Sequence, residues 1–292
     1  MEEPAFKPLN SCRVAIVGLG LMGGSLALDL RGKCAERVGV ARKPATLDLA
    51  LRRGMIDRAA EFDAAVDECD LIVLATPPRT ILAHLCALAE RPTVSADAKV
   101  IVDLGSTKAE IVAAMEGLPA NFEPVGGHPM CGKEVSGAAA AELGLFRGQT
   151  FVLIPLGRTC VEAFSLAHEM ATSLGARPLV LSAAQHVALV AATSHLPYVA
   201  AVALVQAAAA AGDERVWEVA ASGFRDTSRL AASDLTMMVD ILLTNRAAVL
   251  EALRAYRAQT DRLAELIERG DAEALRAALA PAQARRAALF KD

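Results

Sequence analysis

A glycine-rich segment close to the start of the chain has the residue types and spacing of a phosphate-binding turn. Residues 18–24 read GLGLMGG, which contains the pattern G-x-G-x-x-G. In this pattern the first glycine allows a tight turn, and the second lets the backbone approach a pyrophosphate at a helix N-terminus. A later glycine lets the helix pack closely on the preceding strand. The predicted cofactor contacts are Gly18, Gly20, Leu21, Met22 and Gly23. This segment indicates an NAD(P)-dependent dehydrogenase.

The end of the second predicted strand bears on the choice between NAD and NADP. Sites that prefer NAD usually carry an acidic residue there, roughly 20 residues after the glycines, which holds the ribose hydroxyls. Here the strand ends Val40-Ala41-Arg42-Lys43, with no acid at its tip. Arg42 and Lys43 could bind a 2′-phosphate, or they could be solvated turn residues. We expect NADP to be preferred, with NAD also possible.

Further polar segments interrupt the apolar sequence. Thr76 and Pro77 follow the strand LIVLA, at the carboxyl edge where open α/β sheets bind ligands, and they are predicted to border the cofactor. Residues 103–108 (DLGSTK) leave another strand at this edge, and residues 126–134 (GGHPMCGKE) are expected to form a glycine-flanked loop. In the second half of the chain, the polar segments are residues 194–198 (SHLPY) and 223–229 (GFRDTSR).

Short β-branched runs that alternate with helical stretches predict how residues 1–181 fold. The predicted strands are residues 13–17, 37–40, 71–75, 100–104, 151–154 and 178–181. Helical stretches are expected at residues 25–31, 47–53 and about 160–174. This alternation indicates parallel βαβ units with right-handed crossovers, which form a doubly wound, Rossmann-type sheet.

Residues 182–292 are expected to form a second, all-α domain. Alanine- and leucine-rich segments with helical spacing dominate there, and we find no convincing strand. The run 196–211 is apolar nearly all round but is shorter than the ~18–20 clean apolar residues of a membrane span, so we interpret it as a buried helix. A single copy would bury it with difficulty. We therefore expect a homodimer formed through this domain, although a monomeric bundle could also hide the helix.

Composition and charge exclude several other classes of protein. With 54% hydrophobic and 22% charged residues, the chain has the composition of a globular protein. Its net charge of −4 gives no electrostatic reason to expect nucleic acid or a membrane as a partner. Its six cysteines form no C-x-x-C pair, so we expect reduced thiols and no metal site. The polar, acidic start is unlike a signal peptide, and we expect a cytoplasmic protein.

Together these motifs resemble the prephenate/arogenate dehydrogenase family of tyrosine biosynthesis. The resemblance runs from about Arg13 to past Asn245, and the segments G-G-H-P-x-x-G-x-E and S-H-L-P are more specific than the glycine motif. It implies oxidative decarboxylation of a cyclohexadienyl substrate. A hydride passes from the ring carbon that bears the hydroxyl to the nicotinamide, and carbon dioxide leaves as the ring becomes aromatic. The product would be 4-hydroxyphenylpyruvate or tyrosine.

The resemblance also implies roles for individual residues. His128 matches the family's catalytic histidine, and a neutral imidazole suits the removal of the hydroxyl proton near pH 7. Ser106 matches a serine close to the substrate hydroxyl and the nicotinamide, although a serine there could also be a helix N-cap. Arg229 matches an arginine that binds a substrate carboxylate through its fixed fork of donors. It could instead form an ion pair with Asp226 within the helix.

The remaining matches lie on the substrate side. Ser194 and His195 match the substrate-side helix, although His195 could simply be a core histidine. Tyr198 stands where many members have histidine. Met238 stands where some carry a tryptophan that faces the substrate across the dimer, and Met237 and Met238 are most simply core residues. Lys133 replaces a frequent threonine and could add a positive charge for a carboxylate. The choice between prephenate and arogenate, and feedback inhibition by tyrosine, are therefore open.

Two other functions compete with this interpretation. A β-hydroxyacid dehydrogenase or imine reductase would need a catalytic lysine on a helix after the Rossmann domain, but the chain has no lysine between Lys133 and Lys291. A non-catalytic NAD(P)-sensing dimer would not need His128, Ser106 and Arg229 together. The other three histidines, His84, His168 and His186, carry less weight as site residues. We expect His84 and His168 at the surface.

Overall fold

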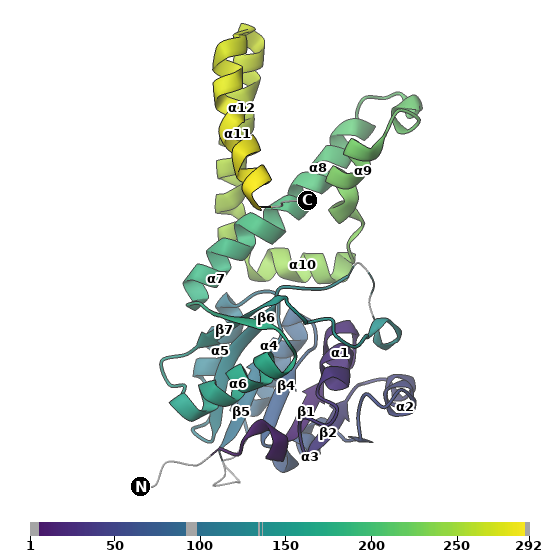
Figure 1. Ribbon diagram of the computed structural model, residues 1–292, viewed down its shortest axis with the longest axis vertical. Coiled ribbons are helices and arrows are strands. Elements are labelled where there is room, and N and C mark those ends of the chain that lie inside the picture. The colour runs from purple at the N-terminus through teal and green to yellow at the C-terminus, as the bar shows by residue number, and fades with distance from the viewer. Residues whose placement is uncertain (1–5, 92–97, 134, 136, 290–292) are drawn as a thin grey trace. The chain divides into compact units, whose positions relative to one another are not determined.

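The computed structural model describes residues 6–91, 98–133, 135 and 137–289, and it divides into two compact units, residues 1–245 and 246–292 (Figure 1). The first unit is built on a sheet of eight strands. These strands are β1 (Arg13–Val17), β2 (Glu36–Val40), β3 (Arg58–Ala59), β4 (Leu71–Leu74), β5 (Lys99–Asp103), β6 (Phe122–Pro129), β7 (Thr150–Pro155) and β8 (Arg177–Val180). Their order across the sheet is β3-β2-β1-β4-β5-β6-β7-β8. The strands are added in one direction from β1 to β3 and in the other from β4 onward, while β1 and β4 pair in parallel, which confirms the predicted doubly wound fold.

The helices of the first unit connect the strands and then continue beyond them. They are α1 (Leu21–Asp29), α2 (Pro44–Arg52), α3 (Phe62–Glu68), α4 (Pro78–Ala89), α5 (Ala109–Glu116), α6 (Val161–Ser173), α7 (Ala183–Val190), α8 (Leu196–Ala209), α9 (Ser222–Ser228) and α10 (Leu235–Thr244). Short 3-10 turns are η1 (Leu9–Ser11), η2 (Ala138–Ala140), η4 (Glu214–Trp217) and η5 (Arg229–Ala232). A π-helical turn, η3 (Ala191–His195), joins α7 to α8. No strand follows β8 among the described residues.

Alternating side chains give the sheet two buried faces. In β1, Val14 and Ile16 belong to the hydrophobic core that α1 and α6 cover. Ala15 and Val17 point into the opposite core, which α3, α4 and α5 cover. Because successive residues of a strand point to opposite faces, an uninterrupted apolar run such as VAIV (residues 14–17) is what a sheet covered on both sides requires. The helix–sheet–helix layering therefore follows from the sequence of the strands.

All six predicted strands are present, but the sequence interpretation missed β3 and β6. β6 reads FEPVGGHP, and its two prolines and two glycines are residues that normally weaken or end a strand. It forms nevertheless, because it lies between β5, which it pairs in parallel, and β7, which it pairs in antiparallel orientation. His128 therefore lies in a buried strand, and the prediction that it occupies a loop is wrong.

The apolar helix after the sheet is longer than expected. α7, η3 and α8 form one continuous helix over Ala183–Ala209, with a mean hydropathy of 1.7, so by length and composition alone it could cross a membrane. Core helices of other proteins pass the same test, which makes this weak evidence. Within α8 only Tyr198 and Ala201 are buried. This exposure agrees with the expectation that a single copy would bury the helix with difficulty, and it leaves apolar surface uncovered.

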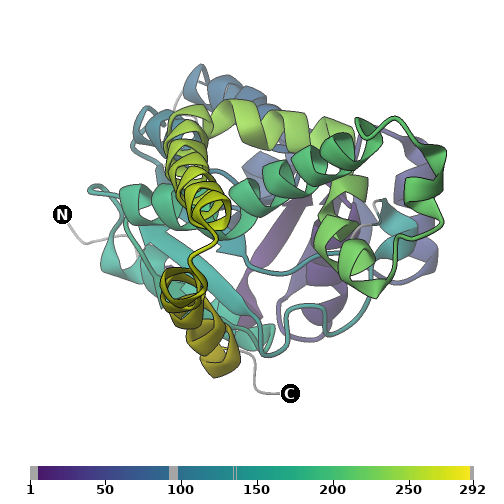
Figure 2. The ribbon, with the colours of Figure 1, turned by 90° about the horizontal axis from the view of Figure 1, so that it is seen from above.

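The C-terminal half of α10 forms an ion pair and a hydrogen bond with residues at the edge of the sheet. Within the first unit, α10 lies at the carboxyl end of the strands, as Figures 1 and 2 both show. Arg79 of α4 forms an ion pair with Asp240 of α10, with 3.1 Å between Nε and Oδ1. The hydroxyls of Thr107 and Thr244 lie 2.8 Å apart and are buried. These contacts place α10 against the edge where α/β folds bind ligands.

The second unit consists of two helices, α11 (Arg246–Arg269) and α12 (Ala272–Leu289). They are joined at Gly270, whose φ of +65° is in the left-handed region that glycine adopts without a steric penalty. Val249 is the buried residue of α11, and no described residue of α12 is buried. Most of the surface of this helical pair is therefore solvent-exposed in the single chain.

Candidate active site

The glycine turn has the geometry that a dinucleotide needs. Gly18 has a φ of +97°, and a Cβ atom on it would lie 2.8 Å from the carbonyl oxygen of Ala75. A Cβ on Gly23 would lie 1.9 Å from the carbonyl oxygen of Gly18, so this glycine is what lets α1 approach the turn. A Cβ on Gly20 would meet nothing within 4 Å. Gly20, the N-cap of α1, therefore has open space beside it, where a pyrophosphate could approach the backbone.

The residues after β4 border the same turn. Thr76 contacts Gly18, since its Cγ2 would lie 2.7 Å from a Cβ atom on that glycine. Oγ1 of Thr76 is buried and has no hydrogen-bond partner within the described part of the chain. Because buried hydroxyls are normally paired, this orphaned atom fits a site that a polar ligand completes. Pro77 is the N-cap residue of α4, next to Thr76. Both residues lie where the sequence predicts, and the glycine turn with Thr76 fits a nicotinamide dinucleotide.

The two basic residues after β2 are solvent-exposed. Arg42 and Lys43 lie between β2 and α2, where Lys43 is the N-cap residue of α2 and makes no side-chain cap. Of the described residues, none forms an ion pair with either of them. Their positive charges are therefore not neutralised at the tip of the second strand, which is where the adenosine ribose lies in folds of this type.

A buried ion pair organises the turn between β5 and α5. Nζ of Lys108 lies 2.7 Å from Oδ2 of Asp103, and both side chains are completely buried. Lys108 also donates hydrogen bonds to the carbonyl oxygens of Gly105 and Thr107, while Asp103 accepts from the backbone N–H groups of Gly105 and Gly127. Burial raises the pKa of Asp103 and lowers that of Lys108, and their mutual attraction opposes both shifts. The pair thus ties this turn to β6.

Ser106 lies in the turn that this ion pair holds. Ser106 is half-buried and lies between Gly105 and Thr107. α5 begins only at Ala109, with Lys108 as its N-cap residue and no side-chain cap, so the alternative interpretation of Ser106 as a helix N-cap is wrong. Because Asp103 also accepts a hydrogen bond from the N–H of Gly127, the turn with Ser106 is held next to the strand residue that precedes His128.

His128 contacts a second histidine, which comes from the helices that follow β8 in the first unit. Its Nδ1 lies 2.8 Å from Nε2 of His186, a fully buried residue of α7, and the two rings meet edge to face. Burial holds the pKa of His128 well below its ordinary value, and the nearby Lys108, His186 and His195 lower it further. Burial also lowers the pKa of His186 to about 3. Both imidazoles are therefore neutral near pH 7.

Sequence reasoning gave little weight to His186, which the structure places in direct contact with His128. The local signal was weak: His186 follows the capping residues of α7, Ser182 and Gln185, at the start of an otherwise apolar helix. Nothing in that pattern indicates a contact with β6. Of the two histidines expected at the surface, His168 is exposed, whereas the ring of His84 is partly buried and stacked on Phe62.

His195 is the last residue of the π-helical turn and is 1% exposed. Nδ2 of Asn245 lies 3.0 Å from its Nδ1 and 3.2 Å from the carbonyl oxygen of Val187. Burial lowers the pKa of His195 to about 4. His195 could be a satisfied core histidine and still face the site, because among the described residues only one of its ring nitrogens has a hydrogen-bond partner.

The other predicted substrate contacts are spread more widely. Tyr198 is buried in a small cluster with Met238 and Ile241. Ser194 is exposed on η3, and Arg229 is exposed as the first residue of η5. Lys133 forms an ion pair with Glu142, with 2.5 Å between Nζ and Oε2. Glu134, which belongs to the glycine–histidine motif, lies outside the described residues.

Met237 and Met238 differ in their surroundings. Met238 is 6% exposed and belongs to the core, as predicted, whereas Met237 is 39% exposed. The prediction of a core residue is therefore wrong for Met237. Adjacent residues of a helix point about 100° apart, so a helix with one buried face cannot bury both.

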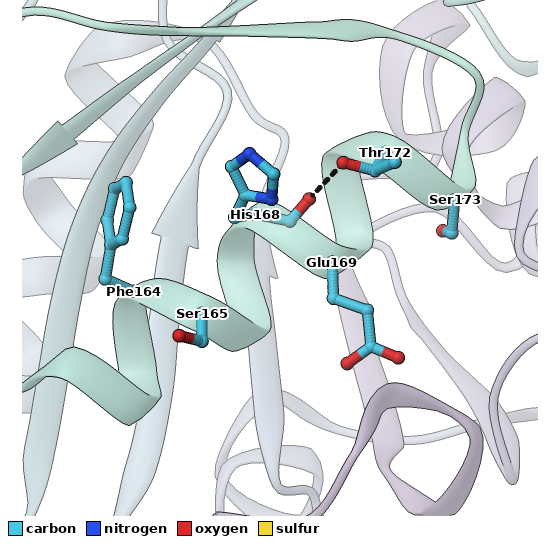
Figure 3. A pocket seen from close by; sticks show the side chains of 6 residues that line it. All are labelled: Phe164, Ser165, His168, Glu169, Thr172 and Ser173. Carbon is cyan, nitrogen blue, oxygen red and sulfur yellow. Dashed lines mark hydrogen bonds between the residues drawn. The ribbon is translucent and has the colours of Figure 1, made fainter.

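A surface pocket lies on α6, and none of the predicted site residues line it. Figure 3 shows its lining, which comes from one helix: Phe164, Ser165, His168, Glu169, Thr172 and Ser173. The hydroxyl of Thr172 donates a hydrogen bond to the carbonyl oxygen of His168 in the preceding turn. The described residues contain no group of three or more His, Cys, Asp or Glu side chains that could hold a metal ion. The candidate catalytic centre lies instead at the sheet edge and contains His128, His186 and His195.

Comparison with known proteins agrees with this architecture. Residues 26–180 match the family model described as "Prephenate dehydrogenase, nucleotide-binding domain", and residues 182–281 match "Prephenate dehydrogenase, dimerization domain". The chain belongs to the prephenate dehydrogenase family. It is therefore an oxidoreductase, and the resemblance found in the motifs is confirmed.

Individual relatives match over nearly the whole chain. The prephenate dehydrogenase of Bacillus subtilis is 33% identical over 270 residues, which are 90% of this chain and 72% of that protein. The prephenate dehydrogenase of Aquifex aeolicus, solved with hydroxyphenyl propionate and NAD+, is 30% identical with a TM-score of 0.88, over 97% of this chain and 100% of that one. The arogenate dehydrogenase of Synechocystis is 31% identical with a TM-score of 0.82, over 95% and 100% of the two chains.

The exposed apolar helix lies in the region that matches the dimerization-domain model. The matched dimerization domain, residues 182–281, contains all of α7, η3 and α8. The apolar surface that a single chain leaves open thus lies in the part of the chain that family members use for dimerization. The nucleotide-binding model begins at residue 26, just after the glycine turn, so the geometry of Gly18, Gly20 and Gly23 is independent support for a cofactor at this sheet edge.

Proposed function

We propose that the chain catalyses the NAD(P)-dependent oxidative decarboxylation of prephenate, arogenate or both, giving 4-hydroxyphenylpyruvate or tyrosine and carbon dioxide. One observation supports this proposal above the others: His128, a neutral imidazole, lies at the ligand-binding edge of the sheet and uses Nδ1 for a contact with His186. Relatives of about 30% identity are named prephenate and arogenate dehydrogenases.

In the proposed reaction His128 takes the proton of the ring hydroxyl as that carbon becomes a carbonyl. When Nδ1–H of His128 donates to Nε2 of His186, the lone pair of Nε2 on His128 is free to accept this proton. A nicotinamide dinucleotide, when bound, would supply the acceptor for the hydride of the same ring carbon. The bond to the departing carboxylate breaks, and its electron pair passes into the ring, which becomes aromatic. The carbonyl oxygen then takes back the proton held by His128 and becomes the phenol hydroxyl. A low pKa keeps His128 unprotonated, and therefore ready to act, at neutral pH.

The other predicted contacts are part of the same proposal. Ser106 would hydrogen-bond near the substrate hydroxyl and the nicotinamide, from the turn held by Asp103 and Lys108. We assign Arg229, His195, Ser194, Lys133 and Tyr198 to the substrate. Because Lys133 forms an ion pair with Glu142, its charge becomes available to a substrate carboxylate only if that pair opens.

The cofactor proposal is NADP in preference to NAD. Arg42 and Lys43 support it, as exposed cations after β2 that no described acidic side chain pairs with. The glycine turn and the orphaned hydroxyl of Thr76 fit either dinucleotide. Discrimination would therefore come from the ribose end of the site.

The organisation of the protein completes the proposal. Residues 1–181 would bind the dinucleotide, and residues 182–292 would form the substrate side and the contact between two copies. We propose a homodimer, supported by the exposed apolar surface of Ala183–Ala209 and by the matched dimerization domain. A cytoplasmic location is supported by six free cysteines. A chain that sediments as a monomer at assay concentrations would contradict the dimer.

The direct test is turnover with defined substrates. The protein is incubated with prephenate or arogenate and each cofactor, while reduced nicotinamide and carbon dioxide are measured. We expect equal amounts of both products with at least one substrate, and no turnover with either would refute the proposal. His128→Asn should lower kcat by about 10²–10⁴, the usual effect of a positioned acid–base group. His168→Asn, on the exposed side of α6, is the control and should keep the wild-type kcat.

A further inference from the structure

We infer that Asn245 is a positioning residue that holds His195 in the tautomer with its proton on Nε2, so that His195 presents a hydrogen-bond donor to the site. The inference deepens the proposed function, because it concerns the substrate side of the same site. It assigns different chemistry to the two histidines: His128 accepts a proton, and His195 donates a hydrogen bond to a substrate oxygen.

The orientation of the Asn245 amide is decided by its two neighbours. The side chain is 3% exposed, so water cannot replace a lost partner easily. One amide atom lies 3.2 Å from the carbonyl oxygen of Val187, and a carbonyl oxygen can only accept. That atom must therefore be the NH2 group, because the flipped amide would place two oxygens against each other. The same NH2 group lies 3.0 Å from Nδ1 of His195.

The tautomer of His195 follows from this orientation. The NH2 group has two hydrogens, one for the oxygen of Val187 and one for the ring of His195. Nδ1 of His195 must accept, so it carries no proton. A neutral imidazole then has its single proton on Nε2. Burial lowers the pKa of His195 to about 4, which keeps the ring neutral at physiological pH. Within the described residues Nε2 has no hydrogen-bond partner, so its N–H is available to a ligand.

The backbone around His195 is adapted to this arrangement. α7 ends at Val190, and the π-helical turn Ala191–His195 follows. A π turn contains about one residue more than an α turn, which rotates the side chains that follow it relative to an uninterrupted helix. Such turns are frequent at functional sites. Val187 lies one turn before η3, and His195 is the last residue of η3. The side chain of Asn245 therefore contacts the helix both before the π turn and at its end.

The residue before Asn245 connects this arrangement to the catalytic turn. The hydroxyl of Thr244 lies 2.8 Å from that of Thr107, and Thr107 is adjacent to Ser106. The end of α10 therefore contacts both the turn with Ser106 and the turn with His195. A ligand atom that faces Nε2 of His195 would be an acceptor, which means a carboxylate, carbonyl or hydroxyl oxygen. This matches an oxygen-rich anionic substrate.

The tautomer can be measured without any substrate. The chain contains five histidines, so protein labelled with ¹⁵N only in histidine gives a sparse long-range ¹H–¹⁵N spectrum, in which the pattern of cross-peaks distinguishes the two tautomers. His195→Gln identifies the signals of His195 by their loss. We expect wild-type His195 with a protonated Nε2 and an unprotonated Nδ1. A wild-type spectrum with the proton on Nδ1 would overturn the inference, whatever the variants do.

Substitution tests whether Asn245 is the cause. Asn245→Asp places an acceptor where the amide donates, so we expect the proton of His195 to move to Nδ1. If this variant does not fold, Asn245→Ser serves instead, and a mixture of tautomers is expected. The control is Thr244→Val, which removes the neighbouring bond to Thr107 and should leave the wild-type tautomer. A variant at position 245 that keeps the proton fully on Nε2 would show that Asn245 does not set it.

Kinetics then test the donor role. Losing a donor to a charged oxygen should raise KM of Asn245→Asp by about 10- to 100-fold, with a smaller change in kcat. An unchanged KM would contradict donation to the substrate. If the wild type turns over neither prephenate nor arogenate, the proposed function fails, while the tautomer assignment is still decided by the spectrum.

Discussion

Nδ1 of His128 lies 2.8 Å from Nε2 of His186, although 58 positions separate the two residues in the sequence. The first belongs to β6 and the second to α7, so the proposed base depends on a partner from the helical half of the unit. Nδ1 of His186 has no partner among the described residues, and the fully buried ring is held neutral by desolvation. This pair has consequences for stability as well as for catalysis.

Stability should fall in acid because of His186. Burial lowers the pKa of His186 in the folded chain to about 3, whereas its pKa in the unfolded chain is about 6.5. Between these two pH values the unfolded chain therefore binds the proton more readily than the folded chain. The stabilisation is thus fully present above about pH 6.5 and is lost as the pH falls toward 3. Each such histidine should contribute a slope of about 1.4 kcal/mol per pH unit to the free energy of unfolding.

Urea unfolding at a series of pH values measures this slope, at a fixed protein concentration because association also affects stability. His186→Gln should reduce the slope below pH 6.5 by about 1.4 kcal/mol per pH unit, while His168→Gln, which changes an exposed residue, should not. Equal slopes for His186→Gln and the wild type would show that His186 does not titrate with unfolding.

The charge of Lys108 should set the acid limb of activity. After burial, Lys108 is the next largest influence that lowers the pKa of His128, ahead of His186 and His195. In Lys108→Met the pKa of His128 should rise, so the acid limb of kcat/KM should move to higher pH. Asp103 is then buried without its partner, which costs about 3–5 kcal/mol of stability.

The double variant Asp103→Asn/Lys108→Met restores a neutral pair if the single variant does not fold. Lys99→Met is the matched control, because Lys99 is also a buried lysine but begins β5, at the other end of the strand from Asp103, and donates to the carbonyl oxygens of Asp67 and Cys69. Lys99→Met should lose stability and keep the wild-type pH profile. An acid limb that stays in place when Lys108 is removed would exclude this electrostatic role.

Two glycines of the same motif should respond differently to alanine. A Cβ on Gly23 would lie 1.9 Å from the carbonyl oxygen of Gly18, so Gly23→Ala should lower Tm and weaken cofactor binding together. A Cβ on Gly20 meets nothing within 4 Å, so Gly20→Ala should keep Tm but raise the cofactor Kd about tenfold or more. Thermal unfolding and nucleotide titration measure both effects. If Gly20→Ala binds the cofactor with wild-type affinity, the pyrophosphate does not bind beside Gly20.

Cofactor preference should depend on the residues after β2. Replacing Arg42 and Lys43 together by alanine should lower kcat/KM for NADP by about 10- to 100-fold, because charged hydrogen bonds to the 2′-phosphate are lost. The value for NAD should change little. Arg52→Ala, an exposed arginine at the far end of α2, is the control and should not alter the ratio. A wild-type enzyme with a strong preference for NAD would refute the assignment.

Much of the fold could be predicted from local sequence patterns. β1 and β5 are short, continuous apolar runs, and the glycine turn follows β1 directly, so neighbouring residues suffice to recognise them. β6 was missed because its prolines and glycines are unfavourable for a strand by themselves, and only pairing with β5 and β7 compensates. What covers α8 could not be predicted for a related reason, because the apolar sequence of a helix does not specify whether residues of the same chain or of a second copy pack against it.

The chemical groups and the local turns can be recognised from neighbouring residues: the glycines at 18, 20 and 23, Ser106 after a strand, and His128 within its motif. Their partners depend on the folded chain. His128 meets His186, and His195 meets Asn245, 50 positions away. These contacts depend on how α7 and α10 pack across the sheet edge, and this packing is set by many distant side chains together. No short-range pattern encodes it, so the state of each histidine could be read only from the folded chain.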